Sequence, residues 1–153
     1  MKNKLGDNAD KVRVGSVDAF QGMEFDVIFL SVVRSNGNAP MVRLGRGVKP
    51  QKIDFSKLEM DVSQLDKDGA TYKEWEAYRD KVGIQNYGFL ISENRLCVSL
   101  SRQKKLLIVV GNTDMFQNEE WGRLSKICVP GMKQLYESCK REDVIYDGHS
   151  ESI

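Results

Sequence analysis

Two short, nearly continuous apolar runs dominate the hydrophobic pattern of this chain. Residues 25–33 read FDVIFLSVV and residues 106–110 read LLIVV, and both are rich in β-branched side chains. Runs of this length and composition predict strands that are buried on both faces. A third, shorter strand is expected at 12–17, where small apolar and polar residues alternate.

Helical periodicity separates and follows these runs. One helix is expected over 72–82, begun by a capping box from Thr71 to Glu74 and stopped by Gly83. A second is expected over 93–104, with Ser92 as its N-cap. A third follows Thr113 or Asp114, and a fourth starts at Pro130. Apolar strands that alternate with helices predict an α/β fold with a parallel sheet flanked by helices.

The segment between the two apolar runs has a different texture. Residues 36–70 are rich in glycine and contain Pro40 and Pro50, which predicts a long, partly irregular insertion. With the helix that follows, the insertion between two core strands spans 37–86. Its four basic residues fit either contacts with phosphates or a solvated loop: Arg43, Arg46, Lys49 and Lys52.

Composition narrows the class of protein. The length of 153 residues suits one domain, 1–153, and a net charge of +1 argues against binding through a general excess of positive charge. Three scattered cysteines and one histidine, His149, form no metal-site pattern, so no metal site is expected. No apolar run could cross a membrane or form a signal peptide, and the expected location is the cytoplasm, or the nucleus in a eukaryote.

The first stretch that carries candidate chemistry is the turn before the run at 25–33. Gln21, Gly22 and Glu24 lie in this turn, and Asp18 is expected to cap it in a box with Gln21. In open α/β sheets ligands bind at loops beyond the strand ends. Glu24 therefore suits a ribose hydroxyl or a cationic partner, while the alternative is a turn shaped by Gly22 with an exposed glutamate.

The second stretch is the helix expected over 93–104. Arg95, Ser99 and Arg102 are spaced i, i+4, i+7, which places them on one helical face. Two guanidinium groups and a hydroxyl presented together suit an anion such as phosphate. The alternative is a solvated face with surface ion pairs.

Together and in this order, the two stretches resemble motifs V and VI of superfamily 1 helicases. VDAFQGME at 17–24, continued by 34–36, resembles motif V of the branch that contains the RNA helicase of nonsense-mediated decay. GFL at 88–90, NRL at 94–96 and VSLSR at 98–102 resemble motif VI. The resemblance covers about 12–36 and 87–127, including the following strand, Gly111-Asn112 and Trp121. It implies the C-terminal part of a second RecA-like motor domain, of the P-loop NTPase type.

The resemblance implies a role for individual residues. Arg102 corresponds to the arginine finger, which points across the cleft at the γ-phosphate of ATP and stabilises charge during phosphoryl transfer. The residues implied to line the nucleotide are Gln21, Gly22, Glu24, Arg95 and Arg102. Ser16 and Ser31 correspond to hydroxyl contacts with the backbone of single-stranded DNA or RNA, which position the strand without reading its sequence.

The sequence also departs from the family pattern. Lys104 replaces a second arginine, Asn94 replaces a frequent arginine, and the link between the motifs is unusually long. The chain has no GxxxxGK[ST] phosphate loop, so ATP with Mg²⁺ is expected to be held mainly by the first motor domain of the same polypeptide.

These departures leave three interpretations. The first is the motor-domain part of an ATP-dependent helicase that is inactive alone. The second is a non-catalytic relic that binds nucleic acid or acts as a scaffold. The third is an unrelated doubly wound domain that binds a nucleotide or a protein. Self-association of the isolated chain is expected from an unpaired sheet edge.

Overall fold

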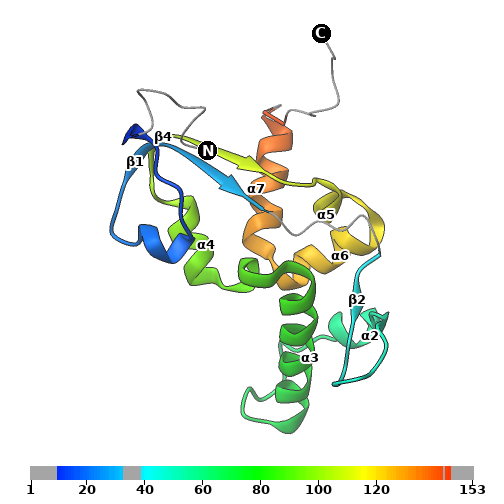
Figure 1. Ribbon diagram of the computed structural model, residues 1–153. Helices are drawn as coiled ribbons and strands as arrows, with labels where there is room; N and C mark the ends of the chain where they lie inside the picture. The colour runs from blue at the N-terminus through cyan, green and yellow to red at the C-terminus, as the bar shows by residue number, and fades with distance from the viewer. Residues whose placement is uncertain (1–9, 33–38, 143, 146–153) are drawn as a thin grey trace.

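Two parallel strands, seen in the upper left of Figure 1, form the parallel sheet of the molecule. The computed structural model describes residues 10–32, 39–142 and 144–145. Strand β1 (Phe25–Ser31) pairs with β4 (Gln103–Val110), with Val27 opposite Leu106 and Ser31 opposite Val110. The predicted parallel α/β arrangement is therefore confirmed. The motif positions 34–36 and His149 lie outside the described residues.

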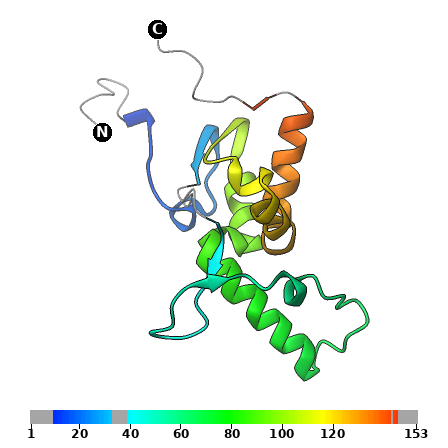
Figure 2. The ribbon, with the colours of Figure 1, turned by 90° about the vertical axis from the view of Figure 1, so that its right-hand side faces the viewer.

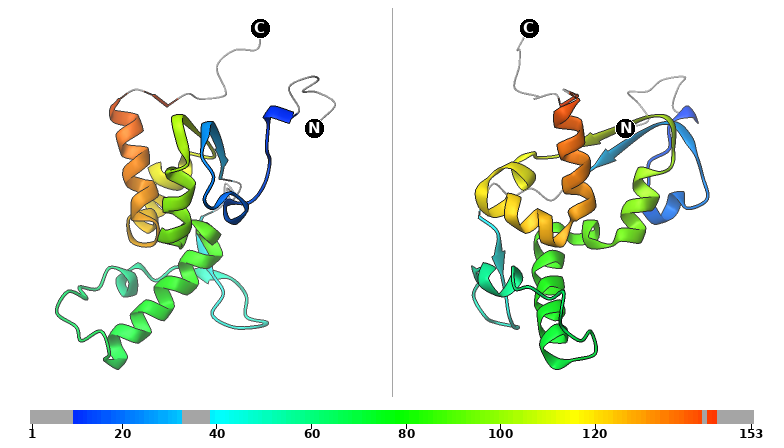
Figure 3. Two further views of the ribbon diagram at one scale, coloured as in Figure 1. Left: turned by 90° about the vertical axis from the view of Figure 1, so that its left-hand side faces the viewer. Right: turned by 180° about the vertical axis from the view of Figure 1, so that it is seen from behind.

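The prediction that both faces of the strands are buried is wrong. Leu30 is buried on the face that α7 (Pro130–Arg141) covers, whereas Phe29 on the opposite face is 70% exposed. Helix α7 lies behind the strands in Figure 1 and in front of them in the view from behind in Figure 3. Within the described part of the chain, helices cover one face of the sheet, so apolar side chains on the other face stay in contact with solvent.

The expected strand at 12–17 is also absent from the structure. Residues 12–16 have no regular secondary structure, and Val14 is 76% exposed. A strand needs a hydrogen-bonded neighbour. Among the described residues, the parallel sheet contains only β1 and β4, and residues 12–16 pair with neither of them. The 3₁₀ helix η2 (Val17–Phe20) follows, so Asp18 lies inside a helical turn instead of capping it. Gly22 ends the turn as predicted, with a φ of 76°.

The segment between the strands is partly regular. A short antiparallel hairpin joins β2 (Met41–Val42) to β3 (Gln51–Lys52), and helix α2 (Phe55–Leu58) follows with Asp54 as its N-cap. The Asp54 side chain accepts a hydrogen bond from the Lys57 amide at 3.3 Å. This region projects from the sheet and packs against α3 (Figure 1).

Helix α3 is longer than its sequence pattern predicts. It runs over Ala70–Tyr87, starts after Gly69, and ends at Gly88, which has a φ of 60°. Gly83 is an interior residue, and it permits close packing: a Cβ built there would lie 3.0 Å from Ile91 Cγ2 and 3.5 Å from Cys128 Cβ. Gly83 therefore allows α3 to pack closely against Ile91 and Cys128, and it does not terminate the helix.

The remaining helices differ from expectation mainly at their ends. After η3 (Gly88–Ile91), helix α4 covers Glu93–Leu100 and stops before the predicted residue 104. The expected third helix is divided into α5 (Asp114–Gln117) and α6 (Glu119–Cys128). The division falls at Asn118, whose side chain accepts a hydrogen bond from the Trp121 amide at 2.8 Å. Helix α7 begins at Pro130 as predicted.

A buried tyrosine joins the end of α3 to α5 and α6. The Tyr87 hydroxyl donates to the carbonyl of Trp121 at 3.1 Å, and its ring meets the Trp121 ring edge-on at 5.6 Å. Burial raises the pKa of Tyr87 above its ordinary value. This contact fixes the orientation of α3 on the helical layer. Across the described residues, none of the helices has the length and apolar content that a membrane span requires.

Candidate functional site

The two candidate stretches meet at the amino ends of β1 and β4. The Phe25 amide donates to the Arg102 carbonyl at 2.9 Å, which holds the end of the first stretch against the end of the second. The sheet register extends this contact, because Phe25 pairs with Gln103. Residues separated by more than seventy positions in sequence therefore form one continuous surface.

Three ion pairs cross between the two stretches. Asp18 pairs with Arg95 at 3.2 Å, Glu24 with Lys104 at 3.6 Å and Asp26 with Lys105 at 2.8 Å. A hydrogen bond from Lys105 lowers the pKa of Asp26. All six side chains are at least half exposed, so these pairs contribute little to stability. Their effect is to orient the side chains and to give Arg95, Lys104 and Lys105 an acidic partner each.

Arg102 lies in the short link between α4 and β4. Its side chain is partly buried. Its Nε is inaccessible to solvent and has no hydrogen-bond partner among the described residues. Among the residues that the structure describes, no acidic group forms an ion pair with it. A buried guanidinium N–H without a partner is costly, and a rotation of the side chain toward an anion at the surface would satisfy it.

The predicted single helical face of Arg95, Ser99 and Arg102 is wrong. Helix α4 ends at Leu100, so Arg102 is not on the helix. Ser99 is buried, and its hydroxyl donates to the Arg95 carbonyl of its own helix at 2.8 Å. Ser99 is therefore not presented to a ligand. Strand β4 begins at Gln103, and its pairing with β1 competes with continuation of the helix.

The turn before β1 presents the remaining nucleotide candidates. Gln21, Gly22 and Glu24 are all exposed. The positive φ of Gly22 reverses the chain between η2 and β1. Because no strand forms at 12–16, the turn lies at the amino end of β1 and not beyond the carboxyl end of a described strand.

The two serines predicted to contact nucleic acid lie at different places. Ser16 is exposed immediately before η2, on the same side as the turn. Ser31 is exposed at the last position of β1, which is the opposite end of the strand from Phe25. The structure thus groups Ser16 with the candidate nucleotide residues and separates Ser31 from them by the length of the strand.

Sequence reasoning missed three members of this surface. Asp18, Asp26 and Lys105 were not predicted as site residues, although they complete the ion pairs. A usable signal is present in the sequence, because acidic residues open the first strand and lysines open the second. Pairing two parallel strands from their amino ends places those opposite charges side by side.

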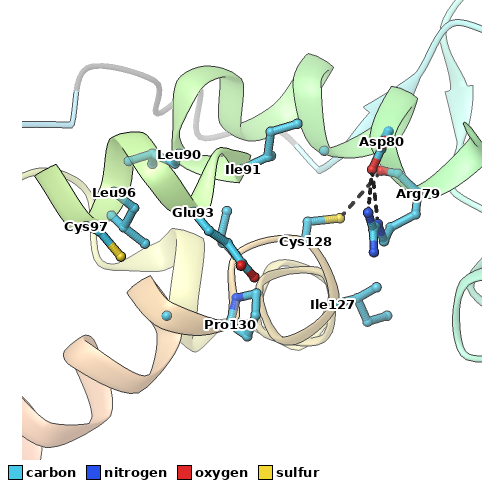
Figure 4. Close-up of a pocket in the computed structure, with 13 residues that line it drawn as sticks. Arg79, Asp80, Leu90, Ile91, Glu93, Leu96, Cys97, Ile127, Cys128 and Pro130 are labelled. Atoms are coloured by element: carbon cyan, nitrogen blue, oxygen red, sulfur yellow. Dashed lines mark hydrogen bonds and ion pairs between the residues drawn. The ribbon is translucent and has the colours of Figure 1, made fainter. Parts of the chain in front are cut away.

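A separate groove of about 490 Å³ lies between α3, α4 and the junction of α6 and α7 (Figure 4). It is lined by the ion pair of Arg79 and Asp80, at 2.7 Å, and by apolar side chains that include Leu90 and Leu96. None of the predicted site residues lines it. In the described ranges, no three acidic, cysteine or histidine side chains cluster as metal ligands would.

Comparison with known proteins gives the family. The model of a family described as AAA domain matches residues 1–114. The chain is 31% identical over 121 residues to the putative helicase mov-10-B.1 of Danio rerio, and 32% identical over 121 residues to mov-10-B.2 of the same species. It is 30% identical over 121 residues to one component of the ATP-dependent helicase/nuclease of Clostridioides difficile (strain 630).

These matches cover 78%, 78% and 74% of this chain and 8% of each relative. The chain therefore spans a small part of the length of the relatives it matches. No solved structure matches the chain significantly. The family match, the helicase relatives and the two motifs in order agree, and the chain belongs to the AAA domain family as the C-terminal motor-domain part of a superfamily 1 helicase.

Proposed function

We propose that this chain supplies the arginine finger of an ATP-dependent superfamily 1 helicase, and that Arg102 is that residue. The observation that carries the proposal is the buried Arg102 Nε, which has no hydrogen-bond partner. Guanidinium is permanently charged and binds phosphate oxygens through two parallel N–H bonds. The γ-phosphate of ATP, held mainly by the first motor domain, would satisfy this donor once the Arg102 side chain turns outward toward it.

The neighbouring cations are less suited to the same role. Arg95, Lys104 and Lys105 each have an acidic partner within 3.6 Å. A cation that keeps such a partner presents a smaller net charge to a phosphate. Arg102 combines partial burial with a missing partner, so its charge acts in a less polar environment, where electrostatic stabilisation of a transition state is greatest.

The turn before β1 forms the nucleotide side of the proposed site. Glu24 and Gly22 line the cleft near the ribose or the γ-phosphate, and Gln21 connects this side to the nucleic acid. Arg95 pairs with Asp18 at 3.2 Å and would contact the same nucleotide. Bound Mg²⁺ would neutralise phosphate charge, and the residues of this chain would position and stabilise the transferring group.

The nucleic-acid side of the proposal uses Ser16 and Ser31. Both hydroxyls are exposed, and hydroxyl contacts with phosphate hold a single strand in place. The partner is single-stranded DNA or RNA. The segment 37–86 is proposed to be an insertion within one domain, 1–153, added to the motor without interrupting its two paired strands.

A second candidate function is a non-catalytic relic that retains nucleic-acid binding. The ion pair between Glu24 and Lys104 favours it. Each charge neutralises the other at positions where a motor would use them to contact the nucleotide. The two candidates differ in whether Arg102 affects ATP turnover.

The test is nucleic-acid-stimulated ATP hydrolysis by the native polypeptide or assembly that carries this chain. Arg102→Ala is expected to lower turnover by about 10³–10⁵-fold while ATP binding is retained. Arg141→Ala, on the exposed end of α7, is the matched control and should leave turnover unchanged. Unchanged turnover in Arg102→Ala would reject the finger, and a wild type without turnover would favour the relic.

A further inference from the structure

The hairpin formed by β2 and β3 is strongly basic. Residues 41–52, here called the basic hairpin, contain no aspartate or glutamate, although the whole chain is nearly neutral with a net charge of +1. Its cations are Arg43, Arg46, Lys49 and Lys52. All four are exposed. Such a local excess of positive charge in a balanced chain would attract an anionic partner.

The cations of the basic hairpin have no acidic partner among the described residues. Elsewhere Arg79, Arg95, Lys104, Lys105 and Arg123 each pair with an acidic side chain. In the described part of the molecule, none of the four hairpin cations forms an ion pair. The repulsion among the four positive charges on this short hairpin is therefore not compensated by acidic side chains. An anion bound from outside would reduce it.

Two amide side chains fasten the basic hairpin to α3. Asn86, which is 8% exposed, accepts from the Met41 amide at 3.3 Å and donates to the Met41 carbonyl at 2.9 Å. Gln85 accepts from the Arg43 amide at 2.8 Å and donates to the Arg43 carbonyl at 3.0 Å. Each amide thus mimics a neighbouring strand, and the hairpin is held in a defined orientation.

The loop of the basic hairpin suits contact with a nucleic-acid backbone. Lys81 donates to the Leu44 carbonyl at 3.1 Å and adds a fifth cation at the base of the loop. Leu44 and Val48 are exposed beside the cations and offer apolar contact to sugars or bases. Gly47 has a φ of 79°, and no atom lies within 4 Å of a Cβ built on it, so its backbone is open to close approach.

The loop and the candidate site face the same way. In the side view of Figure 2, the loop between β2 and β3 extends to the side of the molecule on which residues 10–24 lie. Helix α3 also links the hairpin to the candidate site, because it leads through η3 into α4 with Arg95. In Figure 1 the hairpin and residues 10–24 lie at opposite edges of the molecule, so a nucleic-acid strand that contacts both would cross the face between them.

We propose that the basic hairpin binds the phosphate backbone of single-stranded nucleic acid and extends the track of the motor. The inference rests on the proposed function for the existence of that track. An acidic protein surface would also satisfy the cations. The exposed apolar side chains of Leu44 and Val48 and the open backbone at Gly47 favour nucleic acid, and the protein partner becomes an outcome of the test.

The experiment measures binding of labelled oligouridylate and oligothymidylate to the native polypeptide that carries this chain, over a range of salt concentrations. Arg46→Gln with Lys49→Gln removes two phosphate contacts. The slope of log K against log salt is expected to fall by about 1.4, which is roughly 25-fold weaker binding at about 0.1 M salt. Arg46→Lys with Lys49→Arg should retain the wild-type slope.

The matched control is Lys126→Gln with Lys140→Gln, which changes the same net charge on exposed positions of α6 and α7. Equal slopes for the hairpin and control variants would overturn the inference. So would loss of polyglutamate binding by the hairpin variant with oligonucleotide binding unchanged, which would assign the hairpin to an acidic protein. If the hairpin variant changes the salt slope but Arg102→Ala keeps normal turnover, the arginine finger alone is rejected. If Arg102→Ala loses turnover but the hairpin variant keeps the wild-type slope, the hairpin proposal alone is rejected.

Discussion

At the scale of residues, acidic partners divide the basic side chains of the candidate site into two kinds. Arg95 and Lys104 are oriented by Asp18 and Glu24 across the two stretches. Arg102 is held by its main chain instead, through the bond from the Phe25 amide to its carbonyl. This arrangement fixes the backbone of Arg102, while its guanidinium has no ion pair among the described residues.

Burial also separates the cysteines in a way that chemistry can test. Cys128 is buried and its pKa is raised to about 12, mainly by desolvation, whereas Cys97 is exposed. At pH 8 the thiolate fraction of Cys128 is about 10⁻⁴. Iodoacetamide should therefore modify Cys97 and leave Cys128 intact in the folded chain, as read by mass spectrometry of peptides. Equal modification of both cysteines without denaturant would contradict this burial.

The sequence predicted individual residues unevenly. The order of the two motifs points to Arg102 without any assumption about the helix, and that prediction stays untested by the fold. Helical spacing alone was misleading, because it placed Ser99 on one face with Arg102. The Ser99 hydroxyl instead donates to the Arg95 carbonyl of its own helix at 2.8 Å. Periodicity cannot report where a helix ends when a strand pairing with a distant segment competes for the same residues.

At the scale of elements, helix ends and packing decide where the site is placed. Helix α4 stops at Leu100 and β4 starts at Gln103, which turns the chain at Arg102. Helix α3 passes through Gly83 because the neighbouring elements require a small residue there. A glycine near the end of an apolar pattern predicts a stop, and tertiary contact with Ile91 and Cys128 reverses that prediction.

The role of Gly83 predicts a measurable loss of stability. Gly83→Val introduces a side chain whose Cβ would lie 3.0 Å from Ile91 Cγ2, and overpacking of this kind costs about 1–3 kcal/mol. Urea denaturation of the folded chain should show this decrease in the free energy of unfolding. Ala77→Val on the exposed face of the same helix is the control for β-branching. If both variants lose equal stability, the close contact at Gly83 is not important.

At the scale of the whole molecule, one face of the sheet remains open. Val27 and Phe29 of β1 lie beside Leu106 and Ile108 of β4, and the first three of these are exposed. The parallel pairing could be predicted from the composition of the two apolar runs. Burial on both faces could not, since it depends on which elements cover the sheet and not on the strands themselves.

The open face predicts self-association of the isolated chain. Exposed apolar patches on a sheet favour association, so light scattering should report a dimer or a larger species. Phe29→Lys, which places a charge on the patch, should shift the distribution toward the monomer. Val144→Lys, an exposed apolar position outside the sheet, should not. A monodisperse monomer of the unmodified chain would contradict the prediction.

As the arginine finger, Arg102 is expected to act on the transferring phosphate and not on the bound ground state. The most direct measurement is the affinity of the native polypeptide or assembly for Mg²⁺–ADP–aluminium fluoride, a transition-state analogue, compared with its affinity for a non-hydrolysable ATP analogue. We expect Arg102→Ala to weaken binding of the transition-state analogue by about 10³-fold or more, while the ATP analogue binds as in the wild type. Equal binding of the transition-state analogue by both proteins would contradict the assignment of Arg102 as the arginine finger.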